Sequence, residues 1–159
     1  MIDTATVYQT EEGVGLGVKR AIDEGLVRRE DVFVMTKLPP YDQSVDKVCI
    51  GFRDLIWNQT NDQLRALQTV EMIEESLKVL QLDYLDCVLI HFPGRPKDFN
   101  PQNKSVFFSS ITSDPVRAPE ARMVMWEALQ KCQQEGKVRH IGVSNFNRHH
   151  IEKLVQDSR

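Results

Sequence analysis

Short apolar runs alternate along this chain with longer stretches whose apolar residues recur at helical spacing. The runs Asp31–Lys37 and Leu85–His91 predict strands covered on both faces. Met1–Thr4 and Val138–Val143 predict two further strands. Helices are predicted over Thr10–Glu24, Val70–Leu80 and Pro119–Glu135, with a last helix after Asn147. Strands and helices in strict alternation, joined by right-handed crossovers, predict an α/β fold with a parallel sheet.

Glycine and asparagine mark the ends of these predicted helices. Gly25 follows the first helix and Gly136 follows the third, which is the usual place for a glycine at a helix end. Asn147 is suited to cap the last helix, whose apolar face carries Ile151 and Leu154. The pattern therefore predicts where the elements stop as well as where they run.

Four polar side chains lie where the first three predicted strands end. Asp3 and Tyr8 follow the first strand, Lys37 closes the second, and His91 closes the third. A core does not favour lysine or histidine at the end of an apolar strand. In parallel α/β proteins, chemistry gathers at the carboxyl ends of the strands. These positions therefore predict a shared site.

Four motifs in order resemble the aldo-keto reductase family. Asp3–Gly15 resembles its first signature and Arg139–Phe146 its second, while Thr36–Leu38 and Leu82–Pro93 match the segments between them. Any one motif alone is weak, but four in the same order are specific. The resemblance covers most of the chain and lapses at about 41–69 and 94–119.

The resemblance implies an incomplete (β/α)8 TIM barrel in which residues 1–159 supply units two to five. A fragment, a truncated gene model or a chain that pairs with another would each explain a partial barrel. Residues 49–69 resemble an atypical insertion, either a wrongly included segment or a lineage-specific loop with a short helix. Residues 94–118 are predicted to form a long loop at the catalytic face.

The resemblance also implies roles for the four strand-end residues in carbonyl reduction. Tyr8 would be the acid, Lys37 its modulator, Asp3 the partner of that lysine, and His91 a donor that orients the substrate. A phenol donates at neutral pH only if its pKa falls from roughly 10, and a neighbouring ammonium lowers it. Each residue also has a simpler explanation on its own: a boundary tyrosine, a solvent-reaching lysine, a turn aspartate or a core histidine.

The resemblance assigns the cofactor to the end of the fourth predicted strand. Ser144 and Asn145 match the pair that hydrogen-bonds the nicotinamide carboxamide in the family, and NADPH is the implied cofactor. A carboxamide needs both a donor and an acceptor, which a hydroxyl and an amide provide. The alternative is that Ser144 and Asn145 only cap the last helix.

Composition narrows the possible partners. The net charge of −3 argues against nucleic acid, and no run is long and apolar enough to span a membrane. The three cysteines, at positions 49, 87 and 132, form no metal-binding motif and suit a reducing, cytoplasmic setting. The charged run 28–31 is predicted to be a solvated turn.

Two functional hypotheses of different classes remain. The first is an oxidoreductase that reduces aldehydes or ketones, as small-molecule carbonyl substrates, to alcohols with NADPH. Half a barrel supplies a poorly preorganised site, so a fragment alone is expected to be inactive. The second is a non-catalytic half-barrel that binds a partner or self-associates through exposed strand edges. Neither the substrate nor the oligomeric state follows from the sequence.

Overall fold

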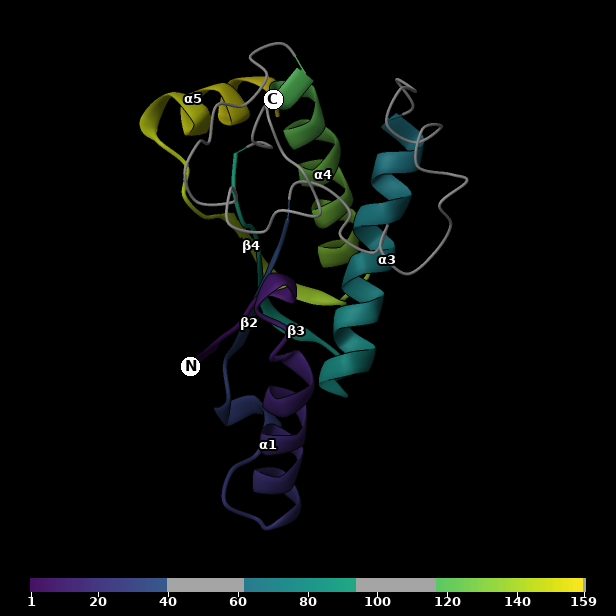
Figure 1. Ribbon diagram of the computed structural model, residues 1–159, viewed down its shortest axis with the longest axis vertical. Helices are drawn as coiled ribbons and strands as arrows, with labels where there is room; N and C mark the ends of the chain where they lie inside the picture. Colours follow the sequence, from purple (N-terminus) through teal and green to yellow (C-terminus); the bar gives the residue numbers. More distant parts are fainter. Residues whose placement is uncertain (40–61, 94–116, 159) are drawn as a thin grey trace.

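Strands and helices alternate through the described part of the chain (Figure 1). The computed structural model describes residues 1–39, 62–93 and 117–158. The strands are β1 Ile2–Asp3, β2 Val34–Leu38, β3 Leu85–Ile90 and β4 Val138–Val143. The helices are α1 Glu11–Asp23, α3 Asp62–Leu80, α4 Arg117–Gln134 and α5 Arg148–Asp157.

The strands form one parallel sheet in the order β1-β2-β3-β4. In its register, Thr36 pairs with Val88, and Val88 pairs with Ile141. Sequence order and parallel pairing are what neighbouring units of a (β/α) barrel require. The predicted partial barrel is therefore confirmed for this part of the chain.

The hydrophobic core lies between the sheet and the helices on one of its faces. Val34 and Leu38 of β2, with Val88 and Ile90 of β3, are fully buried there. Helices α3 and α4 run side by side along the sheet and pack on each other (Figure 1). Their apolar residues, including Ile73, Leu80 and Leu129, complete the core.

The predicted helix ends are confirmed. Gly25 and Gly136 follow α1 and α4 with φ of 70° and 78°, a left-handed conformation that glycine adopts without a steric penalty. Asn147 caps α5, since its side-chain oxygen accepts from the backbone N–H of His150 at 2.9 Å. Ser144 and Asn145 therefore do not cap this helix.

Helices α3 and α4 and strand β2 begin at other residues than the sequence predicted. Helix α3 begins at Asp62 rather than Val70, so residues 62–69 of the predicted insertion belong to this helix. Helix α4 begins at Arg117, which makes the last two residues of the predicted 94–118 loop helical. The rest of both segments lies outside the described residues. Strand β2 begins at Val34 rather than at the predicted Asp31, which belongs to a 3₁₀ turn over Arg29–Asp31.

The prediction of a solvated turn at 28–31 is wrong for Arg29. Its guanidinium bonds Asp86 of β3 at 2.8 Å, and the Arg29 side chain is only 18% exposed. Asp86 is buried, accepts from the backbone N–H of Val34 at 2.9 Å, and also pairs with Arg139 of β4. Tyr84 lies between the two guanidinium groups, at 4.0 and 3.8 Å from its ring centre. This cluster ties the amino ends of three strands together.

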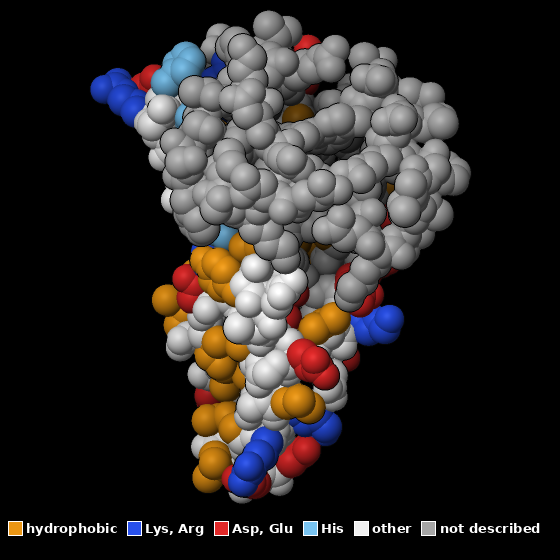
Figure 2. All heavy atoms as spheres, in the orientation of Figure 1, with side chains coloured by type: hydrophobic (Ala, Val, Ile, Leu, Met, Phe, Trp, Pro, Cys, Tyr) orange, Lys and Arg blue, Asp and Glu red, His pale blue; other side chains and the backbone are white. Residues whose placement is uncertain are grey.

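Apolar side chains are visible on the surface around α1 (Figure 2). Leu16 and Leu26 are among those exposed there. Single exposed apolar residues are common on folded proteins, so they indicate no partner by themselves. Within the described ranges, no helix combines the length and the apolar character needed to cross a membrane.

Gly15 allows α1 to pack closely against the end of α3. A Cβ atom at Gly15 would meet the carbonyl group of Leu80, with only 2.6 Å to its carbon. That neighbour is backbone, which cannot rotate away as a side chain can. Gly15 is therefore required by a close approach of two helices rather than by its conformation.

Replacing Gly15 by alanine should destabilise the fold by about 1–3 kcal/mol, because α1 must move away from α3. The matched control is Gly17→Ala in the same helix, where an added Cβ meets nothing within 4 Å. That change should stabilise by roughly 0.5–1 kcal/mol through helix propensity. Denaturant unfolding of both variants measures the difference, and equal stabilities would contradict the close packing.

Candidate active site

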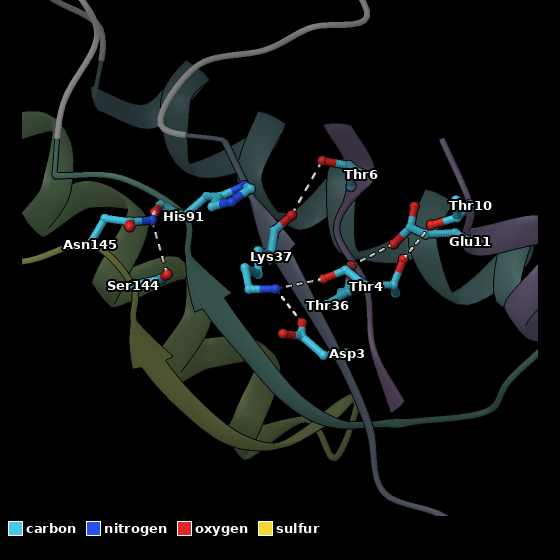
Figure 3. A network of polar contacts seen from close by, with 10 residues as sticks. All are labelled: Asp3, Thr4, Thr6, Thr10, Glu11, Thr36, Lys37, His91, Ser144 and Asn145. Atoms are coloured by element: carbon cyan, nitrogen blue, oxygen red, sulfur yellow. Dashed lines mark hydrogen bonds and ion pairs between the residues drawn. The ribbon is translucent and has the colours of Figure 1, made fainter. Parts of the chain in front are cut away.

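Three of the four polar residues predicted to share a site lie at the carboxyl ends of three neighbouring strands (Figure 3). Asp3 is the last residue of β1, Lys37 is the last but one of β2, and His91 directly follows β3. Lys37 pairs in register with Leu89, so Lys37 and His91 lie at nearby levels on adjacent strands. The parallel sheet thus places groups far apart in sequence at one edge.

Lys37 is the buried charge of the cluster. Its side chain is 7% exposed, and its ammonium forms an ion pair with the Asp3 carboxylate. The ammonium also donates to the backbone carbonyl of Thr4 at 3.1 Å. A buried ammonium is costly unless it is paired and hydrogen-bonded, and β1 and the residue after it supply the two partners.

Tyr8 lies on a 3₁₀ turn over Thr6–Tyr8, between β1 and α1. The residue is 49% exposed, whereas Lys37 and His91 are buried. Its ring centre lies 5.1 Å from the Lys37 ammonium nitrogen. The ring meets the His91 imidazole edge-on, with 5.7 Å between ring centres and 80° between planes. The Tyr8 ring therefore lies beside Lys37 and His91 and is half exposed to solvent.

His91 is a neutral imidazole in this setting. It is 5% exposed and stacks on Phe92 with 4.4 Å between ring centres. Burial first, and then the positive charge of Lys37, lower the pKa of His91 to about 4, while Asp3 opposes that shift. Among the described residues, the buried Nδ1 atom has no hydrogen-bond partner. A buried lone pair is less costly there than a buried N–H, so the proton is assigned to Nε2.

Ser144 and Asn145 follow β4 and lie beside His91 (Figure 3). The Asn145 side-chain nitrogen donates to the backbone carbonyl of His91 at 2.7 Å and to the Ser144 hydroxyl at 3.1 Å. The backbone N–H of Ser144 donates to Ile90 at 2.8 Å. Asn145 has a φ of 59°, a conformation that asparagine tolerates better than most residues. These bonds fix the end of β4 against the end of β3.

Sequence reasoning gave no role to three residues that surround this site. Thr6 donates to the backbone carbonyl of Lys37 at 3.3 Å, and Thr36 donates to the Glu11 carboxylate at 2.7 Å. The sequence does contain a sign that Glu11 is buried, because Glu11 lies at helical spacing from Val14 and Val18 on the apolar face of α1. An acid on such a face needs a partner inside the fold.

Comparison with known proteins agrees with this arrangement. A model of the aldo/keto reductase family matches residues 1–159. The chain belongs to the aldo/keto reductase family. It is 40% identical over 158 residues to aldo-keto reductase AKR2E4 of Bombyx mori, and 35% identical over 157 residues to glyoxal reductase of Bacillus subtilis. In each case 99% of this chain aligns with only 39% of the relative, so the chain spans about two fifths of their length.

Solved aldo/keto reductase structures share the fold. The crystal structure of the Bombyx mori enzyme, in complex with NADP, superposes with a TM-score of 0.66 at 39% identity. It aligns with 99% of this chain, which covers 39% of that structure. The aldose reductase of Schistosoma japonicum gives a TM-score of 0.64 at 28% identity, with 97% of this chain and 43% of that structure aligned. The family resemblance inferred from four motifs is thereby confirmed.

The buried imidazole of this aldo/keto reductase chain should stay neutral from about pH 5 to 8. Because the pKa of His91 is about 4 in the folded chain and 6.5 for an unperturbed histidine, the unfolded chain binds more protons between those limits. Stability should therefore fall as pH falls from 6.5 to 4, by up to about 3 kcal/mol from this group.

Nitrogen-detected NMR of the histidine rings, with His91→Asn used to assign the signal, measures this titration. The expected spectrum shows a neutral ring with its proton on Nε2 at pH 6. A His91 signal that titrates at an ordinary histidine value would contradict the burial and charge described above.

Proposed function

We propose that a complete barrel containing this chain reduces aldehydes or ketones to alcohols with NADPH, in the cytosol. The observation that carries this proposal is the meeting of Tyr8, Lys37, Asp3 and His91 at three adjacent strand ends. Family membership supports it, since one of the relatives is a glyoxal reductase. Buried, free Cys87 and Cys132 suit a reducing compartment.

Tyr8 is proposed as the general acid. Reduction of a carbonyl leaves an alkoxide that needs a proton, and a half-exposed phenol can supply it to a substrate that arrives from solvent. The phenolate left behind is stabilised by the ammonium of Lys37, which lies 5.1 Å from the ring centre. Asp3 holds that ammonium in place through its ion pair.

His91 is proposed to orient the substrate. A neutral ring with its proton on Nε2 is a donor, so it can hydrogen-bond the carbonyl oxygen and stabilise the charge that develops there. Its ring meets that of Tyr8 edge-on, with 5.7 Å between ring centres, so the donor and the acid belong to neighbouring rings. A protonated imidazole is not needed for this role, which agrees with the lowered pKa of His91.

Ser144 and Asn145 fit a nicotinamide carboxamide. Both N–H groups of the Asn145 amide are used within the protein, which leaves its side-chain oxygen as an acceptor. The Ser144 hydroxyl accepts one of those N–H groups and keeps its own proton to donate. The Asn145 side-chain oxygen can accept from the carboxamide N–H group, and the Ser144 hydroxyl can donate to the carboxamide oxygen. When bound, the cofactor supplies the hydride.

Tyr8→Phe should lower the rate of aldehyde reduction by roughly 10²–10⁴-fold, because it removes the acidic proton and keeps the ring. The oxidation of NADPH in the presence of an aromatic aldehyde measures the rate. Tyr84→Phe is the matched control, since Tyr84 packs between Arg29 and Arg139 at the opposite end of the sheet. Turnover that persists unchanged in Tyr8→Phe would refute the proposed acid.

Ser144→Ala should weaken NADPH binding by roughly 2- to 10-fold, the loss expected for one neutral hydrogen bond. The backbone bond from Ser144 to Ile90 remains in this variant, so the strand end keeps its place. Quenching of protein fluorescence by NADPH gives the dissociation constant without any turnover. Ser158→Ala, at the far end of α5, should leave that constant unchanged.

A further inference from the structure

The turn that carries Tyr8 is held by side-chain hydrogen bonds. Tyr8 itself is half exposed, so packing covers only part of its side chain. Across the base of the turn, the hydroxyl groups of Thr4 and Thr10 lie 2.9 Å apart. At its start, Thr6 bonds the backbone of Lys37. These contacts connect the turn to β1 and β2 (Figure 3).

A further connection, three residues after Tyr8, joins Glu11 to Thr36. Glu11 is the first residue of α1 and is 8% exposed, and Thr36 is fully buried in β2. The Thr36 hydroxyl donates to the Glu11 carboxylate at 2.7 Å. Hydrogen bonds to a charged acceptor are roughly twice as strong as neutral ones, and a buried carboxylate depends on the donors that it finds.

The position of this bond relates it to the proposed chemistry. Thr36 and Lys37 are neighbours in a strand, so their side chains point to opposite faces of the sheet. Thr36 faces the core side with Val34 and Leu38, while Lys37 reaches toward Asp3 and Tyr8. The bond therefore fixes the start of α1 directly behind the strand position that presents the ammonium.

We propose that Glu11 and Thr36 are positioning residues for Tyr8. Their hydrogen bond holds the start of α1 on β2, and the short segment from Tyr8 to Glu11 transmits that constraint to the phenol. This inference rests on the proposed function, in which the phenol must face Lys37. Misplacement of a reacting group by about 1 Å can cost roughly 10²-fold in rate.

The test compares Thr36→Val, which removes the hydroxyl, with Thr36→Ser, which keeps it. Thr36→Val should lower kcat by roughly 10- to 100-fold with little change in the KM for NADPH, and Thr36→Ser should restore most of the rate. Glu11→Gln, which keeps the shape and weakens the acceptor, should fall between them. In a Tyr8→Phe background, Thr36→Val should have no further effect on the residual rate.

A second measurement does not require turnover. In protein with Cζ-labelled tyrosine, Thr36→Val should shift or broaden the NMR signal of Tyr8 and leave that of Tyr84 in place. Tyr84 lies between Arg29 and Arg139 and therefore reports on the fold as a whole. Thr36→Ser should reproduce the wild-type signal of Tyr8.

Two results would overturn the proposal. If the Tyr8 and Tyr84 signals both change, the bond serves general stability, and if neither changes, it does not position the phenol. The failure of the proposed function is separable from these results. A protein that shows no reductase activity, but whose Tyr8 signal alone responds to Thr36→Val, would keep the positioning pair and lose the proposed reaction.

Discussion

The rest of the site depends on the ion pair between Lys37 and Asp3. The ammonium of Lys37 is nearly buried at the end of β2, and its two partners, the Asp3 carboxylate and the Thr4 carbonyl, come from β1 and the residue after it. Burying this charge without those partners would be costly. The ion pair therefore links the short strand β1 to the site. If β1 separated from β2, the ammonium of Lys37 would lose both of its partners.

The charge of Lys37 has opposite effects on its two ring neighbours. In the proposed reaction it stabilises the phenolate formed on Tyr8, whose ring lies beside it, and it disfavours a cation on His91, which is already buried. In the proposed reaction one ammonium thus serves both roles, because the phenol gives up a proton while the imidazole remains a neutral donor. Enzymes often give two titratable groups in one site different roles by placing them in environments that favour different charge states.

The sequence predicted the elements of this fold well and their side-chain contacts poorly. Apolar runs and helical spacing depend on local order, so the strands, the ends at Gly25 and Gly136, and the Asn147 cap could be inferred. The meeting of Asp3, Tyr8, Lys37 and His91 followed from strand ends and family motifs. The bonds from Thr36 to Glu11 and from Arg29 to Asp86 join residues far apart in the chain, and they depend on sheet register and helix placement. No local pattern contains that information.

Helix α1 connects the stability of the fold to the geometry of the site. Gly15 sets its closest approach to α3, and Glu11, one turn earlier, sets its position on β2. A helix is stiff over that distance, so its two contacts cannot be adjusted independently. A change that moves α1 away from Leu80 therefore also strains the bond to Thr36 and the turn that bears Tyr8. The inner face of α1 is then constrained by packing and by chemistry together, while its outer face, which carries Gly17, is constrained by neither.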